Sequence, residues 1–211
     1  MPADLVHLVR HGEVENPDGI LYGRLPGYGL SARGRRMAEL AAEALDGRPV
    51  VALVASPLQR AQESAAPWSA RFGLPVTTDE RIIEPTNRFE GGRMSARRIA
   101  TTPSQWGWVV NPWRPSWGEP YRAVEARMLA AIDAAWAAAE GGEVVMVSHQ
   151  MPIVMVARSL AGRPLAHDPR HRRCTLSSIT TIARRDGRWV EVGYQEPAAG
   201  LLQDAIDTGA V

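Results

Sequence analysis

Three short apolar runs, separated by segments of helical character, constrain the fold of this chain most strongly. They comprise residues 4–9 (DLVHLV), 50–56 (VVALVAS) and 143–149 (EVVMVSH), which are rich in valine and short enough to be buried strands. Strands that alternate with helices form βαβ units, in which the strands are parallel and the helices cover the sheet. We therefore expect an α/β fold, a three-layer α/β/α sandwich with a mostly parallel central sheet.

Further segments carry helix and hairpin signals. Four helices are predicted, over residues 32–46, 57–72, 119–140 and 151–162. Ser31 is a suitable N-cap for the first of them, and Pro57 suits the first helical position of the second. Residues 175–194 alternate between apolar and polar side chains around the turn dipeptide Asp186–Gly187. This pattern predicts a hairpin that adds an antiparallel edge strand to the sheet.

Less regular segments lie between the helices and at the end of the chain. One or two short strands are predicted over 74–84, ending at Glu84 in the sequence RIIE. Residues 85–118 show no sustained period, and the tail from Glu196 onward is expected to be peripheral. At 211 residues the chain fits a single domain, 1–211, with an insertion at about 85–118.

Each of the three apolar runs ends in residues that suit a binding or catalytic site. The first ends in Arg10 and His11, the second leads into the helix that carries Arg60, and the third ends in His149. In open α/β sheets, ligands bind just outside the carboxyl ends of the parallel strands. These four side chains are therefore expected to meet at one edge of the sheet.

This set of residues suits the chemistry of a phosphoryl group. Two arginines can clamp its oxygens and stabilise the charge that develops in the transition state. The arginines also favour a neutral His11, which could accept the phosphoryl group while His149 donates a hydrogen bond to it. A leaving alcohol then needs a proton, for which Glu84 is the candidate and Glu13 the rival. All 24 basic residues are arginine, so lysine chemistry is excluded.

Several motifs resemble those of one known family, the histidine phosphatase superfamily, also called phosphoglycerate-mutase-like. They are LVRHGE (8–13), GLSARGRRMA (29–38), ASPLQRAQESA (55–65), SWGEP (116–120) and VVMVSHQMPI (144–153). The similarity runs from about residue 4 to 195 and points to the broad-specificity phosphatase branch. It implies that His11 is the phosphorylated nucleophile and Arg10 a phosphate ligand, and that Arg60 and His149 are the second arginine and histidine of the site.

The sequence also departs from the family pattern near the phosphate pocket. The family commonly has Ser or Thr two residues after the glycine and Asn three residues further on, where this chain has Val14 and Pro17. Asn16 lies one residue early, and Gln150 replaces a frequent glycine; both are candidate phosphate ligands. The acid segment, IIEPTNRFEGG (82–92), is one residue shorter than usual and lacks the inner glycine.

In the family, the segment between the acid and the long helix covers the active site and sets substrate choice. Here that cap corresponds to residues 85–118, which contain four of the seven tryptophans, Trp106, Trp108, Trp113 and Trp117. Residues expected at the substrate rim are Tyr22, Arg24, Trp113 and Arg114. The four tryptophans together with Arg114 would suit a phosphate ester with an apolar or ring-bearing alcohol.

Other readings of the basic and metal-ligand residues are less favoured. His7 precedes His11 by four residues, but on a strand this spacing separates them by about 13 Å, so we expect an interior histidine and no metal site. The run HDPRHRRC (167–174) is expected to form the rim of an anion pocket rather than to bind nucleic acid. Cys174 is the single cysteine, which excludes an internal disulfide; it is not favoured as a nucleophile.

The bulk properties indicate a cytoplasmic protein without a nucleic-acid or membrane partner. Net charge is only +1, and no apolar run approaches the length of a membrane span or a secretory signal. We expect no cofactor, and a homodimer is left open. The expected partner is a small-molecule phosphate monoester.

The favoured function is a histidine acid phosphatase, a hydrolase of phosphate monoesters of small metabolites that works through phosphohistidine. One alternative is a phosphoglycerate mutase-type phosphotransferase, although mutases of the family tend to have a longer insertion than residues 85–118. The other is a catalytically weak relative that binds phosphorylated ligands. The sequence leaves the natural substrate undetermined.

Overall fold

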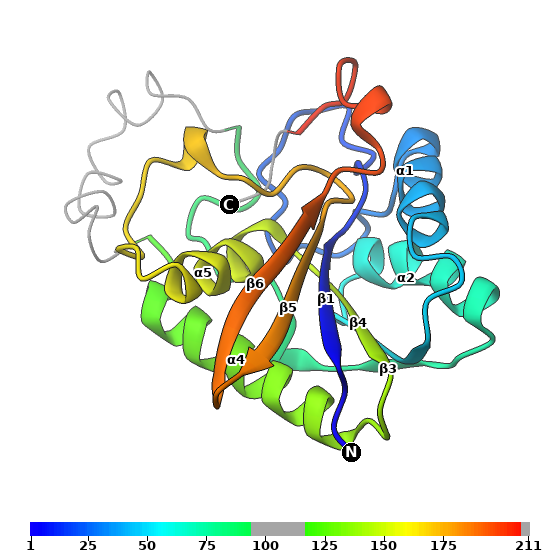
Figure 1. Ribbon diagram of the computed structural model, residues 1–211. Helices are drawn as coiled ribbons and strands as arrows, with labels where there is room; N and C mark the ends of the chain where they lie inside the picture. Colours follow the sequence, from blue (N-terminus) through cyan, green and yellow to red (C-terminus); the bar gives the residue numbers. More distant parts are fainter. Residues whose placement is uncertain (94–116, 208–211) are drawn as a thin grey trace.

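A six-stranded sheet forms the centre of the computed structural model, which describes residues 1–93 and 117–207 (Figure 1). The strands are β1 (Leu5–Arg10), β2 (Val50–Ala55), β3 (Val76–Thr78), β4 (Glu143–Ser148), β5 (Ile179–Arg185) and β6 (Arg188–Gln195). Their order across the sheet is β3-β2-β4-β1-β5-β6. The first four in this order are parallel, and β5 and β6 are antiparallel additions beside β1. The predicted mostly parallel sheet with an antiparallel edge is confirmed.

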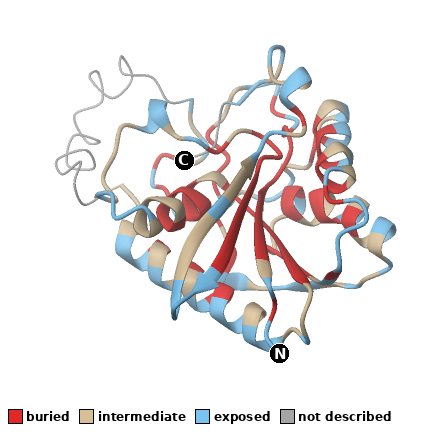
Figure 2. Ribbon diagram, viewed as in Figure 1, coloured by how far each residue is buried: buried red, intermediate tan, exposed pale blue. Residues whose placement is uncertain are grey.

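Helices cover both faces of the sheet, as predicted. They are α1 (Ala32–Glu43), α2 (Gln59–Phe72), α4 (Tyr121–Ala138) and α5 (Gln150–Leu160), with short 3-10 turns η1 (Glu80–Ile82), η3 (Pro169–His171) and η4 (Ala199–Leu201). Alternate strand residues point to opposite faces: Leu8 and Met146 pack with α4 and α5, and Val9 and Val147 with α1 and α2. Figure 2 shows the buried residues on the inner strands and on the helix sides that face them.

Three local features agree with the sequence analysis. Ser31 caps α1, where its hydroxyl accepts a hydrogen bond from the backbone N–H of Gly34. Asp186 and Gly187, both at positive φ, form the turn between β5 and β6. His7 is an interior histidine, since its ring nitrogens lie 3.0 Å from Thr181 Oγ1 and 2.9 Å from Glu143 Oε2.

Two predicted boundaries are wrong. Leu58 has an extended backbone and is the N-cap of α2, so Pro57 lies outside the helix that it was expected to open. In the segment before Glu84, only Val76–Thr78 forms a strand. The Asp79 side chain accepts a hydrogen bond from the backbone of Arg81 and caps the turn η1, which ends the extended chain.

The tail is not peripheral, contrary to expectation. Leu201, Leu202 and Ala205 pack against a small apolar cluster that contains Met37 and Leu176. These apolar contacts turn the last described residues back across the carboxyl ends of the strands (Figure 1). In the described part of the chain, no helix combines the length and apolar character that crossing a membrane requires.

Candidate active site

The side chains predicted to meet do so at the carboxyl ends of β1, β2 and β4. Arg10 ends β1 and is paired in register with Ser148 at the end of β4. His11 and His149 follow these two residues, and their ring centroids lie 5.2 Å apart. Ser56 follows β2 directly and is fully buried, as are both histidines. The three parallel strands therefore deliver the site residues to one point.

A close approach of two backbones explains the glycine after His11. A Cβ atom at Gly12 would lie 2.3 Å from the carbonyl oxygen of Gly34, and one at Gly34 would lie 2.0 Å from that of Glu13. No side chain fits at either position. The loop that carries His11 is therefore held directly against the start of α1, and Gly12 is further fixed by a 3.1 Å hydrogen bond from its N–H to Ser64 Oγ.

The surroundings of His11 keep its imidazole neutral. Its Nδ1 lies 2.8 Å from the carbonyl oxygen of Gly12, which requires the proton to be on Nδ1. Nε2, which then carries the lone pair, has no hydrogen-bond partner among the described residues. Burial, with the positive charges of Arg60 and Arg10, holds the pKa of His11 well below its usual value. The imidazole therefore stays unprotonated at neutral pH.

Two buried guanidinium groups flank this imidazole. Arg60 donates from Nη2 to the carbonyl oxygen of Gly23, 2.7 Å away, and lies 4.7 Å over the ring of Tyr22. Arg10 donates to the carbonyl oxygen of Cys174 and to Asp207. The Nε atoms of both arginines are buried without a partner among the described residues. Each guanidinium is thus held in place and keeps a donor for a ligand.

His149 and Glu84 form the opposite part of the site. His149 Nε2 lies 2.7 Å from the hydroxyl oxygen of Ser56, while Nδ1 lies 3.7 Å from Glu84 Oε2 and has no hydrogen-bond partner in the described chain. If the Ser56 hydroxyl donates to Nε2, the proton of the neutral ring is on Nδ1, on the side of Glu84. In that tautomer His149 can donate from Nδ1 to a ligand.

The two candidate acids differ sharply in their surroundings. Glu84 is 1% exposed, neither carboxyl oxygen has a hydrogen-bond partner in the described residues, and burial raises its pKa to about 7. Glu13 accepts hydrogen bonds from Ser31, from Arg33 and from the backbone of Ile206, and these lower its pKa despite burial. Glu84 can therefore hold and release a proton near neutral pH, whereas Glu13 is a bound carboxylate.

Unsatisfied polar atoms define the ligand that would fit this site. Buried polar groups without partners are rare in proteins, yet several converge here: Arg10 Nε, Arg60 Nε, His11 Nε2, His149 Nδ1 and both oxygens of Glu84. The two arginine Nε atoms and His149 Nδ1 can donate hydrogen bonds to a ligand. His11 Nε2 carries a lone pair that can attack an electrophile, and the carboxyl group of Glu84 can exchange a proton. A phosphoryl ester has the matching acceptors, electrophile and leaving oxygen.

The remaining predicted site residues lie around this centre in different roles. Asn16 closes its own loop, because its amide exchanges hydrogen bonds with the backbone of Ile20. Gln150 donates to the carbonyl oxygen of Cys174 and accepts from Arg172. Arg24 donates from Nε to the backbone oxygen of Glu84. Their proposed contacts with substrate stay predictions.

The predicted rim and cap extend beyond the described part of the chain. Trp113 and Arg114 lie outside the described residues, as do Trp106 and Trp108. Trp117 is described, and its carbonyl oxygen accepts a hydrogen bond from the backbone N–H of Arg88.

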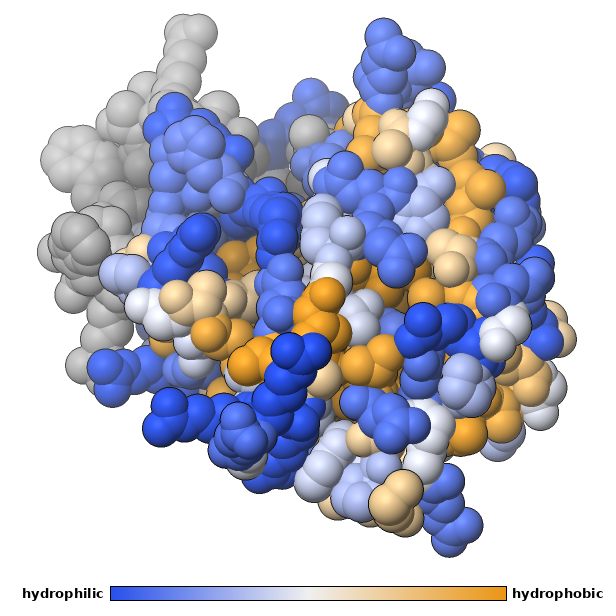
Figure 3. All heavy atoms as spheres, viewed as in Figure 1, coloured by the Kyte–Doolittle hydropathy of each residue, from blue (hydrophilic) through white to orange (hydrophobic). Residues whose placement is uncertain are grey.

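The basic run 167–174 lines a hollow of about 510 Å³ on the outer side of α5. In Figure 3 the surface around this part of the molecule carries both hydrophilic and hydrophobic residues. Arg172 connects the hollow to the site, since its guanidinium donates to Gln150 Oε1 at 3.0 Å.

Burial raises the pKa of Cys174 to about 11, which makes its thiol a poor nucleophile. In the described chain, no three metal-ligating side chains gather to hold a metal ion.

Two contributors to the site were missed in the sequence. Ser56 stands beside a motif that was identified, and its position at a strand end is a signal that could have been used. Asp207 lies in a tail without periodicity, motif or turn signal, and nothing in the local sequence indicates its contact with Arg10.

Comparison with known proteins gives a consistent result. The sequence matches the profile of the Histidine phosphatase superfamily (branch 1) over residues 6–197. The uncharacterized protein Rv0525 of Mycobacterium tuberculosis is 52% identical over 195 residues, which cover 92% of this chain and 96% of the relative. The probable phosphoglycerate mutase GpmB of Yersinia enterocolitica is 30% identical over 203 residues, 92% of each chain. The mycobacterial glucosyl-3-phosphoglycerate phosphatase Rv2419c has a similar structure, with a TM-score of 0.71 and 29% identity over 89% of this chain and 96% of that one.

Proposed function

The chain belongs to the histidine phosphatase superfamily (branch 1), and from that membership we propose that it hydrolyses phosphate monoesters of small metabolites through a phosphohistidine. The observation that carries the proposal is the state of His11. Its Nδ1 is tied to a backbone carbonyl, and its Nε2 is buried without a partner among the described residues, beside two arginines. A neutral nucleophile next to two cations suits attack on an anionic phosphorus centre.

In the first step, His11 Nε2 attacks phosphorus, and the bond from phosphorus to the alcohol oxygen breaks. Arg10, Arg60 and His149 Nδ1 donate hydrogen bonds to the phosphoryl oxygens, which become more negative in the transition state. Glu84, protonated before the step, gives its proton to the leaving oxygen. The alcohol departs and leaves a phosphohistidine.

In the second step, water replaces the alcohol. Glu84, now a carboxylate, takes a proton from the water as the water oxygen attacks phosphorus and the bond to His11 Nε2 breaks. A pKa of about 7 allows one carboxyl group to act as acid and then as base. Inorganic phosphate leaves, and both residues return to their starting state.

A phosphatase is favoured over a mutase because the cap that a mutase needs to exclude water tends to be longer than residues 85–118. We expect release of inorganic phosphate from a panel of phosphate monoesters to be far faster than interconversion of 2- and 3-phosphoglycerate. Orthovanadate should inhibit, and a chelator should leave turnover unchanged. Rapid interconversion with little free phosphate would assign the chain to the mutases instead.

A catalytically weak relative that binds phosphorylated ligands is the second candidate, because the acid segment is shortened and Asn16 is engaged with Ile20. Exposure to an aryl phosphate distinguishes the two. A phosphatase forms a phosphohistidine that is labile in acid and stable in base; a binding protein forms none. The natural substrate, a ring-bearing alcohol part and a cytoplasmic location stay predictions.

Substitution of Ser56 by Ala is expected to lower kcat/KM by about tenfold, by analogy with metal sites, where loss of a group that orients a ligating histidine typically costs 10- to 100-fold. Without the hydroxyl, the His149 ring loses the contact that favours a proton on Nδ1. Ser56→Thr keeps the hydroxyl and should recover activity. Ser69→Ala, a control in α2 whose hydroxyl donates to the carbonyl oxygen of Leu74 away from the site, should leave kcat/KM unchanged. Equal activity of Ser56→Ala and wild type would contradict this role.

A further inference from the structure

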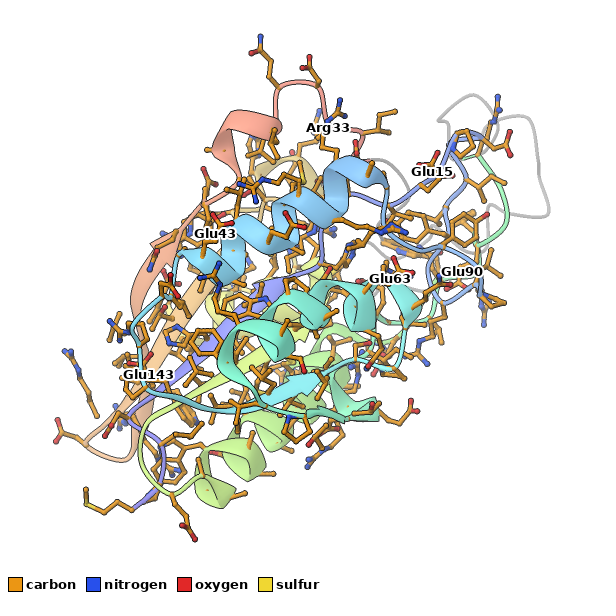
Figure 4. All side chains as sticks on the ribbon, turned by 90° about the vertical axis from the view of Figure 1, so that its right-hand side faces the viewer. Glu15, Arg33, Glu43, Glu63, Glu90 and Glu143 are labelled. Atoms are coloured by element: carbon orange, nitrogen blue, oxygen red, sulfur yellow. The ribbon has the colours of Figure 1, made fainter. Side chains whose placement is uncertain are left out.

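The C-terminal segment 204–207 is fastened to the loop that carries His11. Arg33 of α1 donates to the backbone oxygen of Asp204, and the N–H of Ile206 donates to Glu13 Oε1 at 2.8 Å. Figure 4 shows Arg33 beside this segment, at the end of the sheet opposite Glu143. The segment therefore lies at the carboxyl ends of the strands, against the first turn of α1.

This anchoring brings the carboxylate of Asp207 to Arg10. Asp207 Oδ2 accepts a hydrogen bond from Arg10 Nη1 at 2.8 Å, and Asp207 Oδ1 accepts one from Arg10 Nη2. The carboxylate therefore binds the Nη1/Nη2 edge of the guanidinium in a bidentate manner. Nη1 also donates to the carbonyl oxygen of Cys174 at 2.8 Å. Arg10 is fully buried, whereas the Asp207 side chain is 40% exposed.

The contacts with Asp207 and Cys174 leave two N–H donors of Arg10 available for a ligand. A guanidinium has five N–H donors. Asp207 and Cys174 occupy both donors of Nη1 and one of Nη2. The Nε–H and the second Nη2–H stand side by side on one edge, and Nε has no partner among the described residues. Asp207 thus binds the Nη1/Nη2 edge of the guanidinium. The neighbouring Nε/Nη2 edge keeps two N–H donors, which can bind two phosphoryl oxygens.

We propose that Asp207 is a positioning residue of the phosphate site, which holds Arg10 so that its Nε/Nη2 edge faces the phosphoryl group. The proposal rests on the function proposed above and adds the C-terminal segment to the machinery. Asp207 acts through Arg10 and does not touch the reacting atoms.

The charges around Arg10 explain why such a residue is needed. Arg10 and Arg60 are both buried beside the same site, and each positive charge opposes the other. A buried cation without a counter-ion is costly, and Asp207 supplies the counter-charge at the end of the guanidinium remote from Nε. Because the Asp207 carboxylate is partly exposed, solvent screens its repulsion of a bound phosphoryl group.

The test compares Asp207→Asn with Asp204→Asn, a matched control in the same segment whose side chain is exposed and whose backbone oxygen makes the contact with Arg33. Asp207→Asn should lower kcat/KM for an aryl phosphate and weaken orthovanadate binding by the same factor, about tenfold, the lower end of the range for orienting groups. Asp207→Glu, which keeps the carboxylate, should recover part of the loss. Asp204→Asn should match wild type in both measurements.

A double-mutant cycle separates positioning of Arg10 from a general structural role. In an Arg10→Gln protein, the further change Asp207→Asn should have no additional effect on orthovanadate affinity. A loss of equal size in that background would overturn the proposal, as would an unchanged affinity of the single variant. Tighter orthovanadate binding by Asp207→Asn would show instead that the tail blocks the site. Calorimetric binding of orthovanadate needs no turnover, so a failure of the proposed function would not be confused with a failure of this inference.

Discussion

Replacement of His11 by alanine is expected to abolish hydrolysis of phosphate monoesters, with a loss of about 10⁴-fold or more in kcat, as is found when a covalent nucleophile is removed. Nε2 of His11 has no hydrogen-bond partner among the described residues, and the positive charges of Arg60 and Arg10 act on this ring. The measurement is release of inorganic phosphate from an aryl phosphate, followed by trapping of the phosphorylated protein. The variant should form no phosphohistidine.

His171→Ala is the matched control, because His171 is exposed on η3 and lies outside the site. It should retain the activity and the phosphohistidine of the wild type. Thermal unfolding of both variants checks that the change at a buried position has not unfolded the protein. Wild-type turnover by a folded His11→Ala protein would end the proposal of covalent catalysis.

The parallel part of the fold and the centre of the site could be predicted because both depend on local patterns. A short valine-rich run identifies a buried strand, and the carboxyl ends of parallel strands meet at one edge. Arg10, His11 and His149 each stand at such an end, so their meeting follows from topology alone. Gly12 and Gly34 belong to separate motifs, and the structure shows the shared reason, a contact that leaves no room for a Cβ atom.

The parts that could not be predicted depend on contacts between distant segments. The backbone of Glu84 is fixed by Arg24 and its carboxyl group faces His149, although the residues around it form a capped turn rather than a strand. Asp207 reaches Arg10 only because apolar residues of the tail pack against a cluster that includes Met37. Because tertiary packing sets the contacts of Glu84 and of Asp207, no hydrophobic periodicity or sequence motif indicates them.

The second large effect is expected for Glu84→Gln, which keeps the shape of the side chain and removes its proton exchange. General acid–base catalysis contributes about 10²- to 10⁴-fold, so kcat/KM for an alkyl phosphate should fall within that range. An aryl phosphate has a leaving oxygen that needs no protonation, so the first step should survive. The second step still lacks its base, and the variant should release one equivalent of phenol in a burst before slow turnover.

The pH dependence gives an independent measure of the same group. Burial raises the pKa of Glu84 to about 7, and the acid must be protonated when the alcohol leaves. For wild type, kcat/KM with an alkyl phosphate should therefore fall as pH rises through about 7, because the carboxylate form cannot donate. This limb should disappear in Glu84→Gln and persist in Glu13→Gln, whose carboxyl group is already ionised and bound by Ser31 and Arg33. If the limb instead vanished in Glu13→Gln and stayed in Glu84→Gln, the assignment of the proton donor would be reversed, because the group that titrates in the free enzyme is the one that sets this profile.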